Sequence, residues 1–434
     1  MASLLLWTMS AHAIDIPHQK YTLDNGLTVI LHEDHDLPQV VVNLWYDVGS
    51  KDEVPGRSGF AHLFEHLMFM GTTRLPDAGF DELMEGHGGW NNAWTAEDAT
   101  DYYDVGPSHL LETLLWMEAD RMDGLASAMT QEKLDKQRDV VRNERRQTTE
   151  DTPYGMAWAA LPQICFPDGH PYAHPVIGSH EDLVAATVED VVGFFSTWYV
   201  PNNASLVVAG DFDPEAIKPI IEAYFGHLPA RPLPPRAQPQ APTLPAQPLT
   251  EMTDRVQVPL TMIAWHSPAA YEDGDAALDV LAALLSDGRS SRLVDALVQR
   301  GGLALEASAS QYSQKLSSQF FVELKPTPAA TLEQLEALVF AELQAIAAEG
   351  PTDAELERIR NQLEVSFLQG LESLQGRASR LNRYQAMLGD PGYLDRDLAR
   401  YRAVTAADVQ AAAATLTADR AAIVRVRPAE EGEE

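Results

Sequence analysis

Two histidines and a glutamate stand close together in the segment 58–70. Apolar residues recur there at helical spacing, so His62 and His66 are predicted to project from one face of a helix, with Glu65 beside that face. Two imidazoles one turn apart can bind one zinc ion, and an adjacent carboxylate can reach water bound to that ion. The alternative is a pair of hydrogen-bonded core histidines, but burying these three groups together is costly unless they are paired or bind metal. We therefore predict a zinc site at His62 and His66.

A third zinc ligand has to come from another part of the chain, because a catalytic zinc usually has three protein ligands. The polar segment 131–149 is predicted to be a long helix, and Glu144 is the acidic residue that shares a face with its apolar positions. Arg142, Arg145 and Arg146 surround it in sequence. From these residues alone, Glu144 is either the third ligand or a solvated ion-pair partner.

Two other histidine pairs are weaker candidates for a metal site. His32 and His35 lie at the predicted end of a strand in a polar turn, where we expect both to be exposed. His170 and His174 have helical spacing, but a proline follows each of them and argues against a helix.

The elements that must position these residues are arranged as two similar halves. Thr187 opens a predicted capped helix that a strand follows, and Thr405 opens a second helix and strand in the same order. A Pro-rich segment, 229–250, separates residues 14–228 from residues 251–434 and is typical of a semi-rigid linker. Together with a hairpin predicted at 21–31, the pattern predicts an α+β protein of two homologous domains, each a helix-covered, mostly antiparallel sheet.

Charge and composition limit the classes of partner. The chain has 31 Lys and Arg against 64 Asp and Glu, a formal charge of −33, which repels phosphate backbones and attracts cationic peptides. We therefore expect no nucleic-acid partner. The apolar runs are too short to predict a membrane-spanning helix, and a single cysteine excludes an internal disulfide.

The first residues indicate export. Residues 2–11 are apolar and uncharged, and Ala11-His12-Ala13 is similar to the small-x-small cleavage site of a secretory signal. A basic stretch does not precede them, so we interpret residues 1–13 as the remnant of a signal peptide and expect a periplasmic protein.

Three segments resemble the pitrilysin family of zinc metallopeptidases, which includes insulin-degrading enzyme and the mitochondrial processing peptidases. Residues 57–72 are similar to its active-site helix with the inverted motif His-x-x-Glu-His. Residues 88–95 resemble the family's strand to which substrate peptide is added, which implies substrate contacts at Asn92, Ala93 and Trp94. Residues 140–146 resemble the segment that carries the family's third zinc ligand, which implies that role for Glu144. The length is similar to that of the half-size subunits, which dimerise to enclose a chamber.

The chain departs from the family pattern at two places. Gln137 stands where many members have a second glutamate that supports the zinc site. Val298 and Leu305 stand where active members have an Arg and a Tyr that complete the site across the chamber. The resemblance therefore implies the zinc-bearing half of a site without the half that holds the substrate carbonyl.

Three functions are compatible with this pattern. The first is a zinc metalloendopeptidase subunit that hydrolyses unfolded or short peptides, with Glu65 as catalytic base, in a heterodimer with a homologous subunit that supplies the Arg/Tyr pair. The second is a self-sufficient homodimeric zinc peptidase. The third is a non-catalytic peptide-binding scaffold, against which the intact Glu65 argues, because a structural zinc site needs no adjacent base.

Overall fold

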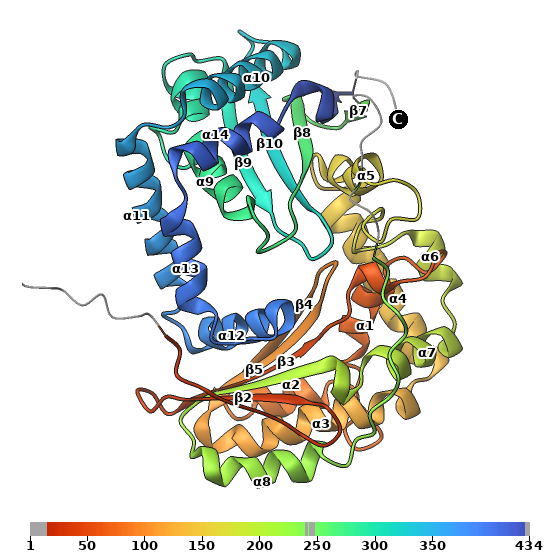
Figure 1. Cartoon of the computed structure of the whole chain (residues 1–434). Helices are drawn as coiled ribbons and strands as arrows, with labels where there is room; N and C mark the ends of the chain where they lie inside the picture. The colour runs from red at the N-terminus through yellow and green to blue at the C-terminus, as the bar shows by residue number, and fades with distance from the viewer. Residues whose placement is uncertain (1–14, 239–241, 243–247, 430–434) are drawn as a thin grey trace, which may run out of the picture.

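The protein consists of two halves, each a β-sheet covered by helices (Figure 1). The computed structural model describes residues 15–238, 242 and 248–429; the predicted signal remnant at residues 1–13 lies outside the described residues. Both sheets are mostly antiparallel, and the predicted α+β fold is confirmed. None of the described helices is both long and apolar enough to cross a membrane.

The first half contains a six-stranded sheet with the strand order β1-β2-β6-β3-β5-β4, so that β4 is an edge strand. Its strands are β1 (Gln19–Thr22), β2 (Thr28–Glu33), β3 (Gln39–Tyr46), β4 (Trp90–Thr95), β5 (Thr100–Pro107) and β6 (Ala204–Gly210). Its helices are α1 (Phe60–Leu67), α2 (Gly79–Glu85), α3 (Leu111–Ala128), α4 (Gln131–Arg145), α5 (Gly155–Cys165), α6 (His180–Ala185), α7 (Val188–Trp198) and α8 (Pro214–Phe225). A π-helical turn, Arg146–Glu150, follows α4.

The second half repeats the strand order of the first. Its five-stranded sheet has the order β7-β11-β8-β10-β9, with one parallel pair followed by antiparallel pairs, as in β2-β6-β3-β5-β4. Its strands are β7 (Leu249–Asp254), β8 (Leu260–Ser267), β9 (Ala304–Tyr312), β10 (Ser318–Pro326) and β11 (Ala422–Pro428). Its helices are α9 (Asp275–Ser286), α10 (Leu332–Glu349), α11 (Asp353–Gln369), α12 (Leu374–Leu388), α13 (Leu394–Ala403) and α14 (Ala406–Thr415).

Local sequence signals account for several of these elements. The predicted hairpin is β1 and β2, and Gly26 in its turn has a φ of 89°, which a residue without Cβ adopts at no steric cost. Thr187 and Thr405 cap α7 and α14 with reciprocal hydrogen bonds to Asp190 and Asp408. The capped helices and following strands that suggested an internal repeat are therefore confirmed.

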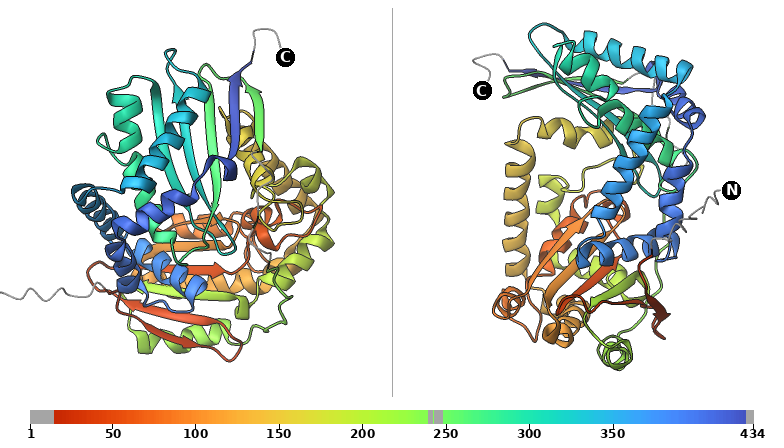
Figure 2. Two further views of the ribbon diagram at one scale, coloured as in Figure 1. Left: turned by 45° about the horizontal axis from the view of Figure 1, so that its top comes forward. Right: turned by 90° about the vertical axis from the view of Figure 1, so that its left-hand side faces the viewer.

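Each half lends one helix to the sheet of the other half. Helix α12 packs on the face of the first sheet formed by residues such as Val41 and Val207, whereas α5 packs against Met262 and Val424 of the second sheet. Figures 1 and 2 show α12 over the first sheet and α5 beside the second. The exchange buries the central strands of both sheets on both faces, and it places α12 opposite the layer that contains α1.

The loop between β9 and β10 also joins the halves. The Lys315 ammonium pairs with Asp47 of the first half, and the Lys315 N–H donates to Asp98 over 2.8 Å. The Tyr172 hydroxyl donates to Asp98 over 2.7 Å and accepts the N–H of Leu316 over 3.0 Å. These contacts hold the second half against the end of β4 and β5. The described residues 229–238 form no helix or strand, and the domain limits taken from the Pro-rich segment stay a prediction.

Candidate metal centre

Helix α1 carries the two histidines, and its apolar face is fully buried. Leu63, Phe64 and Leu67 lie in the first core, so the helix has one orientation on the sheet. Gly59 precedes the helix with a φ of 88°, and a Cβ at this position would come within 2.8 Å of the Ile177 carbonyl. His62 and His66 lie on the side of α1 that faces away from these core residues, as the helical spacing of the segment predicts.

The first turn of α1 is capped by a buried carboxylate from outside the helix. The Glu53 side chain, 1% exposed, accepts the N–H of Gly59 over 3.0 Å and the N–H of Ala61 over 2.7 Å. Burial raises the pKa of Glu53 well above its usual range. These contacts satisfy donors that a helix N-terminus otherwise leaves unpaired, next to His62.

The two imidazoles meet at right angles on one side of α1. Their ring centroids are 4.8 Å apart with an interplanar angle of 88°. Burial, followed by the nearby His66, lowers the pKa of His62 to about 4. His62 is therefore neutral near pH 7, and the neutral imidazole is the form that binds metals.

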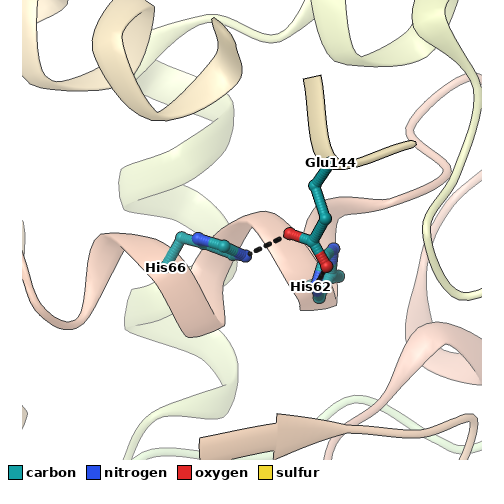
Figure 3. Close-up of side chains that lie close together, drawn as sticks. All are labelled: His62, His66 and Glu144. Atoms are coloured by element: carbon teal, nitrogen blue, oxygen red, sulfur yellow. Dashed lines mark ion pairs between the residues drawn. The ribbon is translucent and has the colours of Figure 1, made fainter. Parts of the chain in front are cut away.

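Glu144 of α4 faces both histidines (Figure 3). Its carboxylate lies 3.1 Å from His66 Nε2 and 3.6 Å from His62 Nε2, and the hydrogen bond from His66 lowers the pKa of Glu144. The arginines beside it in sequence have other partners, since Arg142 contacts His180, Arg145 contacts Glu150 and Gly178, and Arg146 contacts Asn143. The structure thus places Glu144 at the histidines instead of in an arginine ion pair.

The donor set fits zinc. One ligand atom from each of His62, His66 and Glu144 lies within 4.8 Å of the others, and among the described residues this is the group of three or more such side chains that could hold a metal. Two imidazoles and a carboxylate form the His₂Glu set of catalytic zinc sites. These three residues are the ones that would hold the ion.

Glu65 lies between this cluster and the edge strand. Its Oε2 accepts a hydrogen bond from the Thr95 hydroxyl at the end of β4, over 2.6 Å. Burial raises the pKa of the Glu65 carboxyl. No local sequence signal assigned a role to Thr95 or to Glu53, because both act on α1 through contacts between separate segments.

The residues predicted to contact substrate lie on the edge strand itself. Asn92 is exposed and Ala93 is buried, while Trp94 packs edge-on against Trp45 with ring centroids 5.0 Å apart. Since β4 is paired with β5 on one side only, its other edge carries the backbone groups to which an extended peptide can add.

The residues that depart from the family pattern, Gln137, Val298 and Leu305, have different surroundings. Gln137 is buried and donates its amide to Met70 Sδ over 2.6 Å. Val298 is partly buried against the second core, but Leu305 is 56% exposed on β9 and is not a core residue.

Neither of the other histidine pairs belongs to this group of ligands, and one expectation about them was wrong. His32 is 4% exposed, because its Nδ1 contacts the Pro17 carbonyl over 2.7 Å and Arg377 of α12 donates to its Nε2 over 3.1 Å. His35 is exposed as expected and pairs with Glu33 and Asp211.

Each half of the chain matches a family model of the M16 peptidases. The profile described as "Insulinase (Peptidase family M16)" matches residues 28–166, and the profile described as "Peptidase M16 inactive domain" matches residues 185–363. The first match includes His62, His66 and Glu144.

Proteins of similar sequence are described as zinc proteases. "Zinc protease PqqE" of Helicobacter pylori is 30% identical over 383 residues, covering 86% of this chain and 85% of the relative. "Uncharacterized zinc protease YmxG" of Bacillus subtilis is 26% identical over 414 residues, covering 94% and 98%. A crystal structure of a protease from Helicobacter pylori superposes with a TM-score of 0.88 at 27% identity, covering 96% of this chain and 100% of that one.

Proposed function

This chain belongs to the insulinase (M16) family of peptidases, and from that premise we propose that it is the zinc-bearing subunit of a metallopeptidase. The proposed reaction is hydrolysis of peptide bonds in unfolded or short peptides. The observation that carries the proposal is the convergence of His62, His66 and Glu144 beside Glu65 at the end of an edge strand.

Glu65 is the proposed catalytic base. When bound by the two histidines and Glu144, zinc supplies Lewis-acid chemistry at the scissile carbonyl. The Thr95 hydroxyl occupies Glu65 Oε2, which leaves Oε1 to take a proton from the attacking water and to deliver it to the leaving amine. Thr95 also fixes the direction in which that free oxygen points.

The edge of β4 is the proposed peptide-binding element. A substrate in extended conformation pairs with the backbone of Asn92, Ala93 and Trp94 by main-chain hydrogen bonds. Because such pairing reads the backbone more than the side chains, we expect the enzyme to accept unfolded peptides of varied sequence. The charge of −33 favours cationic peptides at long range.

A homologous partner subunit completes the proposed site. The tetrahedral transition state needs hydrogen-bond donors or positive charge for its oxyanion, and Val298 and Leu305 offer neither. We propose that the partner supplies an Arg and a Tyr across the chamber. A self-sufficient homodimer, with these groups elsewhere in the chain, is the competing assembly. We also propose periplasmic residence, from residues 2–13.

The first experiment is a hydrolysis assay with the purified, zinc-loaded chain alone on an unstructured basic peptide, with a chelator control and the Glu65→Gln variant. Bound zinc without turnover supports the two-subunit enzyme, whereas chelator-sensitive turnover that Glu65→Gln abolishes supports the homodimer. A chain that does not bind zinc, or turnover that survives in Glu65→Gln, contradicts the proposed site.

A further inference from the structure

A cavity of about 420 Å³ lies between the two halves, on the face of the first sheet that α12 covers. Trp45 and Trp94 line it from the first sheet, and Arg380, Arg383 and Arg400 line it from the helices of the second half. The volume is within the range of ligand pockets, about 300–1,000 Å³. We call this cavity the arginine pocket.

Two of its arginines have no acidic partner within the parts of the chain that the structure describes. The Arg380 guanidinium stacks on Phe367, with 4.8 Å between its Cζ and the ring centroid. Arg383 donates its Nε to the Tyr271 hydroxyl over 3.4 Å, and the Asp397 carboxylate acts on it only at longer range, without an ion pair.

The acidic residues of the pocket are already occupied. Asp275 pairs with Arg400 over 2.9 Å and also accepts the Ser313 hydroxyl over 2.6 Å. Asp397 pairs with Arg400 over 2.8 Å and accepts the Tyr384 hydroxyl over 2.8 Å. Arg400 is therefore paired with two carboxylates, and the three arginines and two aspartates that line the pocket leave it with one excess positive charge.

The pocket lies beside the strand that we propose binds substrate. Thr95 directs its hydroxyl to Glu65 on the α1 face of the sheet, and successive strand residues face opposite sides. Trp94 therefore faces the α12 side, where it lines the arginine pocket. A peptide added to the edge of β4 alternates in the same way, so every second side chain is directed to the pocket side.

We propose that the arginine pocket is a subsite for an acidic side chain of the peptide substrate, whose carboxylate is bound by Arg380 and Arg383. The inference rests on the proposed function, because it assumes that a peptide adds to β4. Guanidinium groups bind carboxylates through paired, charge-assisted hydrogen bonds. The negative field of the whole chain acts on the net charge of a peptide at long range. The arginine pocket, by contrast, binds a single acidic side chain on the pocket side of the bound peptide.

Peptide binding tests the subsite separately from catalysis. The probe is a set of fluorescent, unstructured Gln/Gly peptides in which a single Glu replaces Gln at each successive position, titrated into the zinc-loaded Glu65→Gln chain. We expect a single Glu to strengthen binding about tenfold over Gln, because the uniform peptide can shift its register on β4 until that Glu faces the pocket. In Arg383→Gln, and in Arg380→Gln combined with Arg383→Gln, this preference falls below about twofold.

The matched control is Arg396→Gln, which removes an exposed arginine that pairs with Asp390 on the same half. It keeps the preference of the unmodified pocket, and thermal melting checks that each variant is folded. A Glu-to-Gln ratio near one, or an equal loss of the preference in Arg396→Gln, overturns the subsite. If the enzyme hydrolyses the Gln peptide but shows no preference for Glu, the subsite alone is refuted. If the chain binds Glu peptides preferentially but hydrolyses none of them, even when mixed with a homologous subunit, the proposed function alone is refuted.

Discussion

Removal of the Glu53 carboxylate is predicted to destabilise the protein and weaken its zinc site together. Its two oxygens accept the N–H groups of Gly59 and Ala61, at 3.0 and 2.7 Å, in a place where the Glu53 side chain is only 1% exposed. A buried donor left without an acceptor costs about 1–3 kcal/mol. Glu53→Ala orphans two of them, so we expect a loss of about 2–6 kcal/mol in the free energy of unfolding.

The zinc site is affected because the orphaned amides belong to the first turn of α1. Ala61 directly precedes His62, so fraying of this turn displaces one proposed ligand. We expect the zinc dissociation constant to rise about tenfold in Glu53→Ala, in the range seen when outer groups of metal sites are removed. Glu53→Gln keeps one acceptor oxygen, so we expect an intermediate loss for both quantities.

Urea unfolding followed by circular dichroism measures the first effect, and competition with a chromophoric chelator measures the second. Glu215→Ala is the matched control, because Glu215 lies in the first turn of α8 with its side chain 78% exposed and is expected to change stability by less than about 0.5 kcal/mol. If Glu53→Ala unfolds at the same urea concentration as the control and binds zinc equally well, the capping of α1 by Glu53 is not what holds His62 in place.

Three further predictions follow from other contacts. Thr95→Val removes the hydrogen bond to Glu65 and is expected to lower kcat of the complete enzyme about tenfold with zinc binding unchanged, as measured by initial rates and metal content; an unchanged kcat contradicts the orienting role. Burial raises the pKa of Asp279 to about 7, so the folded state favours its neutral form and the protein loses stability as pH rises from about 4 to about 7. Asp279→Asn, which can still accept the Tyr401 hydroxyl, is therefore expected to gain on the order of 2 kcal/mol over the parent between about pH 5 and about pH 8 in urea titrations, and parallel pH profiles refute this. A protease site placed at residues 243–247 and cleaved is expected to leave the halves together in size-exclusion chromatography, because α5 and α12 pack on the opposite sheets, and separate peaks refute that account.

Local patterns predicted the parts of the fold that depend on near neighbours in sequence. The Asn25-Gly26 turn, the capped helices at Thr187 and Thr405 and the helical face of His62 and His66 all follow from backbone preferences and spacing within a few residues. The repeat of these signals also predicted two similar α+β units, which the matching strand orders confirm.

Burial of single side chains was less predictable, because it depends on distant segments. His32 has the local sequence of an exposed turn, yet Arg377 of α12 contacts its ring from 345 residues further along the chain. Its own residues left the role of Glu144 ambiguous for the same reason, since its neighbours in sequence are arginines and its neighbours in space are histidines. The family resemblance, and not a local pattern, assigned it as a ligand. Thr95 and Glu53 carry no local signal at all for their contacts with α1.

The sequence by itself determined the donor types, their helical spacing and the secondary structure that presents them, since covalent connection and side-chain size decide these over a few residues. For Glu144 and the edge strand β4, near neighbours in sequence decided nothing: the family resemblance assigned their roles, and the tertiary structure brought both to α1. Only the tertiary structure decided that α5 and α12 are exchanged between the halves. Those features depend on which apolar faces are buried together, and a sheet with two apolar faces can be covered by any helix that the chain brings to it.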